Sequence, residues 1–133
     1  MILVDSNILM YAAGGDHPNK APSIRFLSQV AEGEIDAAID AELLQEVLHR
    51  YTSLNRWSDG SLVYARARIL FPEVLPVTAA VMDTARDLIG RITPLTARDA
   101  VHAAVCQVYE LDGICSFDTD FDRIPGIHRV TPR

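Results

Sequence analysis

The first segment of the chain, an apolar run that stops on a carboxylate, constrains the fold most strongly. Residues 1–4 are apolar and include β-branched side chains, and Asp5 follows them directly. Such a run is typical of a strand buried on both faces, as in a parallel sheet covered by helices. We expect Ser6 or Asn7 to cap the helix that follows. Asp5 is therefore predicted to lie at the carboxyl edge of a sheet, where open α/β folds bind their ligands.

The remaining segments alternate between helical and strand patterns. Apolar spacing, caps and breakers predict helices for residues 8–13, 20–33, 41–51, 58–71, 79–90 and 97–112. Short apolar runs between them predict strands for residues 35–39, 74–77, 114–117 and 127–130. This alternation predicts an α/β fold with a central, mostly parallel sheet of four to five short strands, covered by helices on both faces.

Composition places the chain among globular proteins and leaves its partner open. Of the 133 residues, 49% are apolar and 23% charged, and no segment approaches the roughly 18 apolar residues of a membrane span. We expect no secretory leader, and the unpaired spacing of Cys106 and Cys115 favours a reducing, cytoplasmic setting. A disulfide between these cysteines is the alternative. The net charge of −6 argues against a nucleic-acid coat protein, but not against an enzyme whose acids hold divalent cations.

Two acids follow predicted strands and are expected to project from the same edge of the parallel sheet. Asp5 ends the first strand and Asp118 follows the strand 114–117. Ser116 is placed to hydrogen-bond these carboxylates or a bound water. Taken singly, each acid is explained equally well as a turn or cap residue, so the shared edge is what favours a binding site.

A helical glutamate is the third candidate. Glu46 borders the apolar helix face of Leu43 and Val47, where a carboxylate either extends to solvent or faces a cavity with a cation. Glu42 lies in the first turn of the same helix, where the helix dipole alone accounts for an acid. The pattern therefore favours Glu46 over Glu42 as the functional residue.

The segment 96–102 holds a fourth acid and a histidine. Asp99 follows Thr96 at the spacing of a helix capping box, a role that explains it completely, although a first-turn acid can also point into a cleft. His102 shares a helix face with Asp99 at a spacing found in metal sites. The commoner role for such a histidine is a hydrogen-bonded structural one, and both roles stay open.

Acidic residues alternate from Asp118 through Asp120 to Asp122, as at the start of a calcium loop. Arg123 and Arg129 stand where an EF-hand requires glycine and glutamate, so that type of site is excluded. The three acids still concentrate negative charge that a hard divalent ion would relieve. No glycine-rich phosphate loop, GxSxG or HExxH motif offers competing chemistry.

Four motifs, in this order, resemble those of the PIN-domain ribonucleases, and in particular the VapC toxins of toxin–antitoxin pairs. They are Val4-Asp5-Ser6-Asn7, residues 44–48 (LQEVL), residues 96–104 (TARDAVHAA) and residues 116–121 (SFDTDF). The resemblance covers nearly the whole chain. It implies a single PIN-like nuclease domain over residues 1–133 with a three-layer α/β/α fold.

The resemblance also implies roles for individual side chains. The family's catalytic acids match Asp5, Glu46, Asp99 and Asp118. Metal ligation falls to Asp5, Asp99 and Asp118, with Asp120 as an auxiliary acid, while Glu46 is a ligand or the base that orients water. Asn7 and Ser116 match supporting polar positions. Phe117 departs modestly from the pattern, since a small or polar residue is commoner there.

The implied reaction is hydrolysis of RNA phosphodiester bonds with Mg²⁺, or Mn²⁺ in its place, since all-oxygen donors suit these ions. Arg50 and Arg98 lie near the acids in sequence and are candidate RNA contacts, with simple surface charge as the alternative.

Resemblance to VapC toxins further implies a homodimer and a cognate VapB-type antitoxin whose C-terminal segment lies along a groove beside the site. Leu9, Tyr11 and Phe26 suit such a groove, and they suit a plain core equally.

Two rival functions use the same fold. One is a non-catalytic PIN-like binding or scaffold protein, which has no need of mutually repelling carboxylates. The other is a PIN-fold nuclease that acts on other nucleic acid, for which the same acids would serve.

Overall fold

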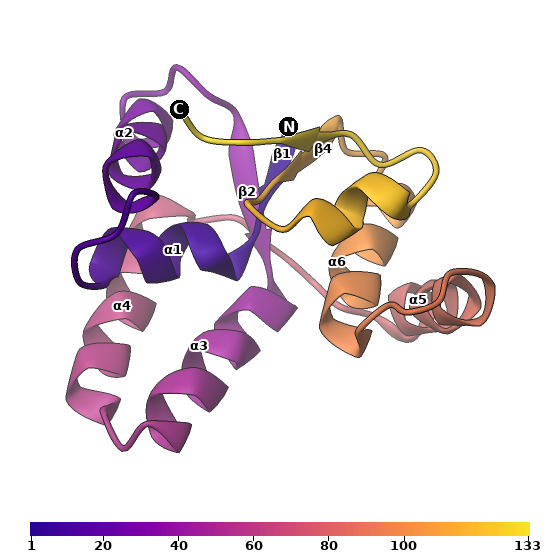
Figure 1. Cartoon of the computed structure of the whole chain (residues 1–133), viewed down its shortest axis with the longest axis horizontal. Helices are drawn as coiled ribbons and strands as arrows, with labels where there is room; N and C mark the ends of the chain where they lie inside the picture. Colours follow the sequence, from indigo (N-terminus) through magenta and orange to yellow (C-terminus); the bar gives the residue numbers. More distant parts are fainter.

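The computed structural model describes residues 1–133 and contains a five-stranded sheet with helices on both faces (Figure 1). The strands are β1 (Ile2–Val4), β2 (Ala37–Asp40), β3 (Val74–Leu75), β4 (Gly113–Cys115) and β5 (Arg129–Val130). The helices are α1 (Ser6–Ala13), α2 (Lys20–Ala31), α3 (Ala41–Ser53), α4 (Trp57–Leu70), α5 (Ala79–Arg91), α6 (Ala97–Val108) and the short 3₁₀ helix η1 (Thr119–Arg123). The predicted α/β fold is confirmed.

The order of the strands places a switch point beside β1. The sheet runs β3-β2-β1-β4-β5, and every neighbouring pair is parallel. From β1 the chain adds β2 and β3 on one side, and it then returns to add β4 and β5 on the other. Ligands of open α/β sheets bind where the strand order reverses in this way, at the carboxyl ends of the strands. Here that point lies between β1 and β4, where Val4 pairs with Cys115.

Burial on both faces of the sheet explains why β1 is apolar throughout. Leu3 packs in the core beneath α5 and α6, and Val4 packs in the second core beneath α1 to α4. Neither side chain is exposed to solvent. Figure 1 shows the two helical layers on opposite sides of the sheet, with the longer series α1 to α4 on one side. The fold therefore has the three layers expected.

Most of the cap residues predicted from the sequence are confirmed. Three predicted caps accept hydrogen bonds from the third residue of their helices: Asp40, Thr78 and Thr96. The prediction for α1 was wrong, because Asp5 itself is the cap and accepts a hydrogen bond from Ser6 N at 2.7 Å. The helix begins directly after the strand, at Ser6, which leaves no room for a separate cap residue.

Two further differences concern the C-terminal part of the chain. The strand predicted for residues 114–117 ends at Cys115, and Asp118 caps η1, which was not predicted. The alternative of a disulfide is wrong, since Cys106 and Cys115 are free and lie in the two separate cores. Burial raises the pKa of both thiols to about 12. None of the helices has the length and apolar character to cross a bilayer.

A close contact between α3 and α4 yields a test of the packing. A Cβ atom added at Gly60 would lie 2.4 Å from Tyr51 Cβ, whereas one added at Gly90 in α5 would meet nothing within 4 Å. Alanine normally stabilises a helix interior by up to about 1 kcal/mol relative to glycine. We expect Gly90→Ala to raise the free energy of unfolding by about that amount. We expect Gly60→Ala to lower it by about 1–3 kcal/mol through overpacking.

Urea unfolding followed by circular dichroism measures both changes. Equal stabilisation by the two substitutions would show that α3 and α4 do not pack as described.

Candidate functional site

Asp5 stands at the switch point and is held there by three hydrogen-bond donors from neighbouring segments. It is 5% exposed. Ser116 Oγ donates to Asp5 Oδ2 at 2.6 Å, and Asn7 Nδ2 donates to the same oxygen at 3.1 Å. The Ser6 N–H donates to Oδ1 at 2.7 Å, and the Ser6 hydroxyl oxygen lies 3.4 Å from the same atom. Asp5 is therefore fixed in one orientation at the end of β1.

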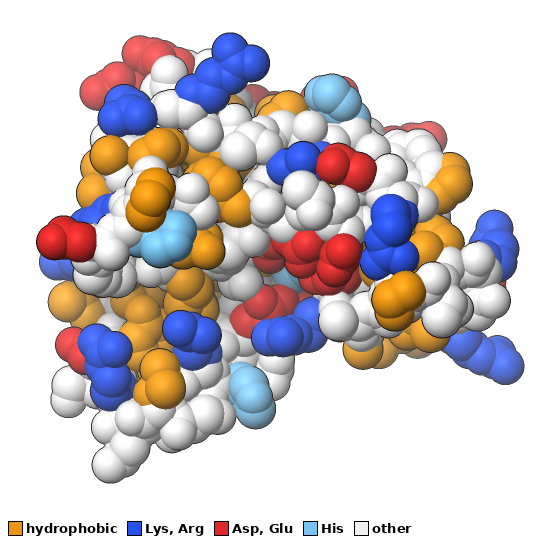
Figure 2. All heavy atoms as spheres, viewed as in Figure 1, with side chains coloured by type: hydrophobic (Ala, Val, Ile, Leu, Met, Phe, Trp, Pro, Cys, Tyr) orange, Lys and Arg blue, Asp and Glu red, His pale blue; other side chains and the backbone are white.

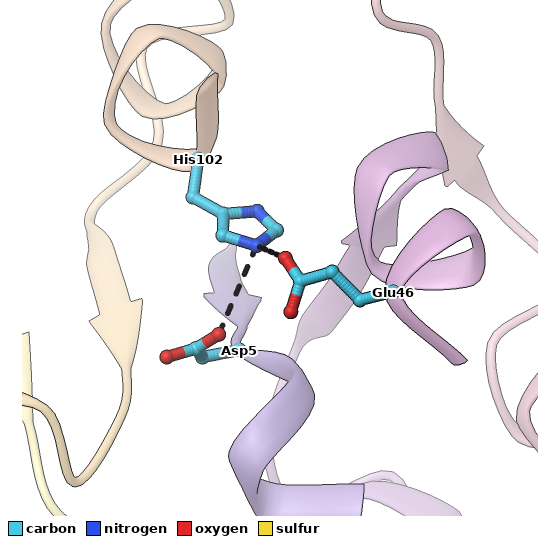
Figure 3. Close-up of side chains that lie close together, drawn as sticks. All are labelled: Asp5, Glu46 and His102. Carbon is cyan, nitrogen blue, oxygen red and sulfur yellow. Dashed lines mark hydrogen bonds and ion pairs between the residues drawn. The ribbon is translucent and has the colours of Figure 1, made fainter. Parts of the chain in front are cut away.

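Glu46 reaches this position from α3 and is bound at both of its oxygens. His102 Nε2 lies 2.6 Å from Glu46 Oε1, and the Ser6 hydroxyl donates to Oε2. Figure 3 shows His102 of α6 pointing between Glu46 and Asp5, with its Nε2 atom 3.8 Å from Asp5 Oδ1. The other ring nitrogen, Nδ1, lies 2.7 Å from Asp40 Oδ2. Both nitrogens of the buried imidazole thus face carboxylates.

These contacts shift the pKa values of His102 and Glu46 in opposite directions. Burial alone would lower the pKa of His102, but the charge and hydrogen bond of Asp40 and the hydrogen bond of Glu46 outweigh it and raise the pKa well above 6.5. Burial would likewise raise the pKa of Glu46, yet the hydrogen bond and charge of His102 lower it below 4.5. An imidazolium therefore joins two carboxylates near neutral pH.

A second group of acids lies beside the first. Carboxylate oxygens of Asp99, Asp118 and Asp120 lie within 4.8 Å of one another. Burial, followed by the charges of Asp118 and Asp5, raises the pKa of Asp99 to about 6. Acidic side chains gather near the centre of the face shown in Figure 2. The donor set contains only carboxylates that repel one another, so it fits a hard divalent cation.

The four predicted acids therefore meet at one edge of the sheet, but as two adjacent groups. Asp99 and Asp118 have no basic partner, whereas Glu46 is paired with His102. The group of Asp5, Glu46 and His102 also has ligand atoms within 4.8 Å of one another and could hold a metal ion. An ion there would require His102 Nε2 without a proton and would replace the contact of Nε2 with Glu46. The carboxylate oxygens of Asp99 and Asp118 are thus more available to a metal ion than those of Glu46.

Two residues of the site were missed by sequence reasoning. Asp40 was expected only as a helix cap, yet its Oδ1 accepts from Leu43 N while its Oδ2 contacts His102. Ser6 was likewise considered only as a cap. An aspartate at the end of an apolar strand segment is the sequence signal that could have drawn attention to Asp40, which the structure buries fully.

A cleft of about 660 Å³ opens beside Glu46 between α1 and α3. Arg50 and Arg98, the two predicted RNA contacts, both line it, as do His49 and Tyr11. The charge of Arg98 contributes to the lowered pKa of Glu46. The acidic edge of the sheet therefore adjoins a cleft that presents cationic side chains.

Comparisons with known proteins agree with this architecture. The sequence profile of the PIN domain matches residues 2–127. Ribonuclease VapC13 of Mycobacterium tuberculosis is 40% identical over 130 residues, which cover 98% of this chain and 99% of that protein. Ribonuclease VapC23 of the same species is 40% identical over 120 residues, covering 89% of this chain and 93% of that protein.

Solved structures show the same fold at lower identity. VapBC2 from Rickettsia felis, solved bound to a DNA fragment from its promoter, superposes with a TM-score of 0.79 at 17% identity, over the whole of both chains. VapC20 of Mycobacterium tuberculosis, a toxin that cleaves the sarcin–ricin loop, gives 0.76 at 21% identity, over 99% of this chain and 100% of that one.

The buried contacts of His102 predict a large effect of removing it. His102→Gln leaves at least one of Asp40 and Glu46 without its partner, and such a buried carboxylate costs about 3–5 kcal/mol. We expect the free energy of unfolding to fall by that amount in urea titrations at pH 7. His49→Gln, at an exposed position of the same helix as Glu46, is the matched control. A loss below about 1 kcal/mol would contradict the ion pairs described.

The raised pKa of Asp99, caused by burial and by the charges of Asp118 and Asp5, predicts a pH-dependent gain in stability on substitution. Its pKa in the fold is raised from 3.8 to about 6, so the protonated form contributes stability that is lost as the pH rises through this range. Without metal, Asp99→Asn should match the unsubstituted protein below pH 3.8 and exceed it above pH 6. Since the side chain is half-buried, we expect a gain of about 1–3 kcal/mol.

Urea unfolding in the presence of a chelator, from pH 3.5 to pH 8, measures this gain. Asp83→Asn, an exposed acid on α5, should show no such rise. A constant difference across the range would show that ionisation of Asp99 does not lower the stability of the fold.

Proposed function

The chain belongs to the PIN-domain family, and we propose that it is a VapC-type ribonuclease toxin that hydrolyses RNA phosphodiester bonds with a divalent metal ion. One observation carries the proposal. Acids from β1, α6 and the segment after β4 converge at the switch point of the sheet, in a chain 40% identical over 98% of its length to a VapC ribonuclease. A scaffold protein would gain nothing from an acidic cluster in which burial and the neighbouring carboxylates raise the pKa of Asp99.

Asp99 and Asp118 are the proposed principal metal ligands, with Asp5 as the third and Asp120 as auxiliary. Carboxylate oxygens favour Mg²⁺, with Mn²⁺ as a substitute. When bound, such an ion polarises a phosphodiester and lowers the pKa of a coordinated water. Ser116 supports two ligands, since its hydroxyl donates to Asp5 and accepts from the Asp118 N–H at 2.9 Å.

Glu46 is assigned the task of orienting the attacking water. His102 and Ser6 hold one oxygen each, so the carboxylate keeps a single position beside Asp5. Its lowered pKa keeps it ionised, and an ionised carboxylate accepts the hydrogen bond of a water. Asn7 completes this support by donating to Asp5.

The RNA backbone is proposed to lie in the cleft beside these acids. Arg50 and Arg98 line the cleft and supply guanidinium groups that bind phosphate oxygens. They offset locally the net charge of −6, which would otherwise repel RNA.

We also propose a VapB-type antitoxin as partner and a homodimer as the toxin's form, both in the cytoplasm. An apolar depression of about 270 Å³ between α1, α2 and α4, lined in part by Leu9, Leu27 and Leu70, suits an apolar antitoxin segment. Of the residues expected in such a groove, Phe26 is instead buried in the core and Tyr11 lines the cleft. Exposed apolar side chains on α5, Met82 and Ile89, suit the contact between protomers.

Removal of a ligand tests the proposal. Asp118→Asn should lower Mg²⁺-dependent cleavage of single-stranded RNA by about 100-fold or more, because loss of metal positioning removes several kcal/mol of transition-state stabilisation. It should also reduce the thermal stabilisation that Mn²⁺ gives the protein. Asp36→Asn, an exposed acid remote from the carboxyl edge, is the control. Expression of the unsubstituted chain should arrest growth, and Asp118→Asn should not.

Cleavage that is equal in Asp118→Asn and the unsubstituted chain would overturn the assignment of the ligand. Cleavage of DNA in preference to RNA would instead support a PIN-fold nuclease that acts on DNA.

A further inference from the structure

Three aromatic side chains form a row that starts at the acidic site. Phe117 directly precedes Asp118, and its ring meets that of Tyr11 edge to face, with centroids 5.4 Å apart and planes at 84°. The Tyr11 ring lies next to that of His17, with centroids 4.5 Å apart and planes inclined by 32°. The row therefore passes from the segment after β4, over α1, to the loop before α2.

The contacts at each end fix the row in place. At the inner end the Phe117 N–H donates to Asn7 Oδ1 at 3.5 Å, and Asn7 in turn donates to Asp5. At the outer end the Asn19 N–H donates to His17 Nδ1 at 3.0 Å. Because Nδ1 accepts this hydrogen bond, the ring hydrogen lies on Nε2, which is free to donate. The ring is held in one orientation although the residue is exposed.

Core packing does not account for the outer half of this row. Phe117 packs against the core, but His17 is exposed and Tyr11 is only partly buried. Both of these rings line the cleft that also holds Arg50 and Arg98. Aromatic faces beside guanidinium groups are the chemistry by which proteins bind unpaired bases and their phosphates.

We propose that Tyr11 and His17, braced by Phe117, form a stacking subsite for an unpaired base of single-stranded RNA. This inference rests on the proposed ribonuclease function. The base lies against the exposed imidazole, the arginines across the cleft bind the adjoining phosphates, and the RNA strand leads from there to the acids. The face of the His17 ring stacks on a base and its Nε2–H donates to one, so the subsite favours a nucleotide that carries a base over an abasic one.

Binding of an RNA oligonucleotide tests the subsite, with cleavage blocked by Asp118→Asn. In fluorescence anisotropy, His17→Ala and Tyr11→Leu should each weaken binding by about 5- to 100-fold, the range observed for loss of one stacked base. Tyr11→Phe keeps the ring and should bind within about twofold of the parent. His128→Ala changes an exposed histidine that lies outside the cleft, directly before β5, and it should have an equally small effect.

Oligonucleotides in which single nucleotides are made abasic identify stacking directly. One abasic position should weaken binding to the parent but cause no further loss in His17→Ala, because the two changes remove the same contact. Additive losses at every position, or equal affinity of His17→Ala and the parent, would overturn the inference. A protein segment, and not RNA, would then be the better occupant of the row.

Cleavage assays separate this inference from the proposed function. In the otherwise unsubstituted chain with Mg²⁺, His17→Ala should raise KM and leave kcat within about twofold, because stacking on the row binds ground and transition states alike. RNA cleavage with an unchanged KM in His17→Ala would overturn the subsite alone. Absence of RNA cleavage by the unsubstituted chain would overturn the ribonuclease function itself.

Discussion

The contact of His102 with Asp40 and Glu46 is the interaction on which the site depends. The imidazole comes from α6, in one helical layer, and Glu46 comes from α3, in the other. Their contact closes the two layers around the carboxyl end of β1, where Asp5 lies 3.8 Å from the ring. Because a buried charge is costly without partners, the pairing selects one relative position of α3 and α6.

The acids of the site therefore differ in whether they have a basic partner. Glu46 is ionised and held by its partners, whereas Asp99 and Asp118 lie close together and form no ion pair with a basic side chain. The first arrangement stabilises the fold and the second opposes it, as expected where binding sites retain destabilising groups for function. A bound divalent ion would turn the destabilising effect of Asp99 and Asp118 into a stabilising one.

Beyond the acids, the surface carries a cleft with cationic and aromatic side chains, although the net charge of the chain is negative. The cleft beside Glu46 holds Arg50 and Arg98 along with Tyr11 and His17. Cationic and aromatic groups therefore lie on the path to the carboxylates, and the net charge of the chain says little about its partner. The apolar depression between α1, α2 and α4 is a separate surface, suited to a protein segment.

The sequence by itself determined the alternation of helices and strands, the caps at Asp40 and Thr96, and the placement of Asp5 at a sheet edge, because these depend on local periodicity and hydrogen bonding. It also carried the motifs that identify the family. The tertiary structure alone decided that Asp40 serves His102 as well as its helix, and that Glu46 is paired while Asp99 is not. Such pairings join residues distant in the chain, and no local pattern encodes which carboxylate a buried imidazole will meet.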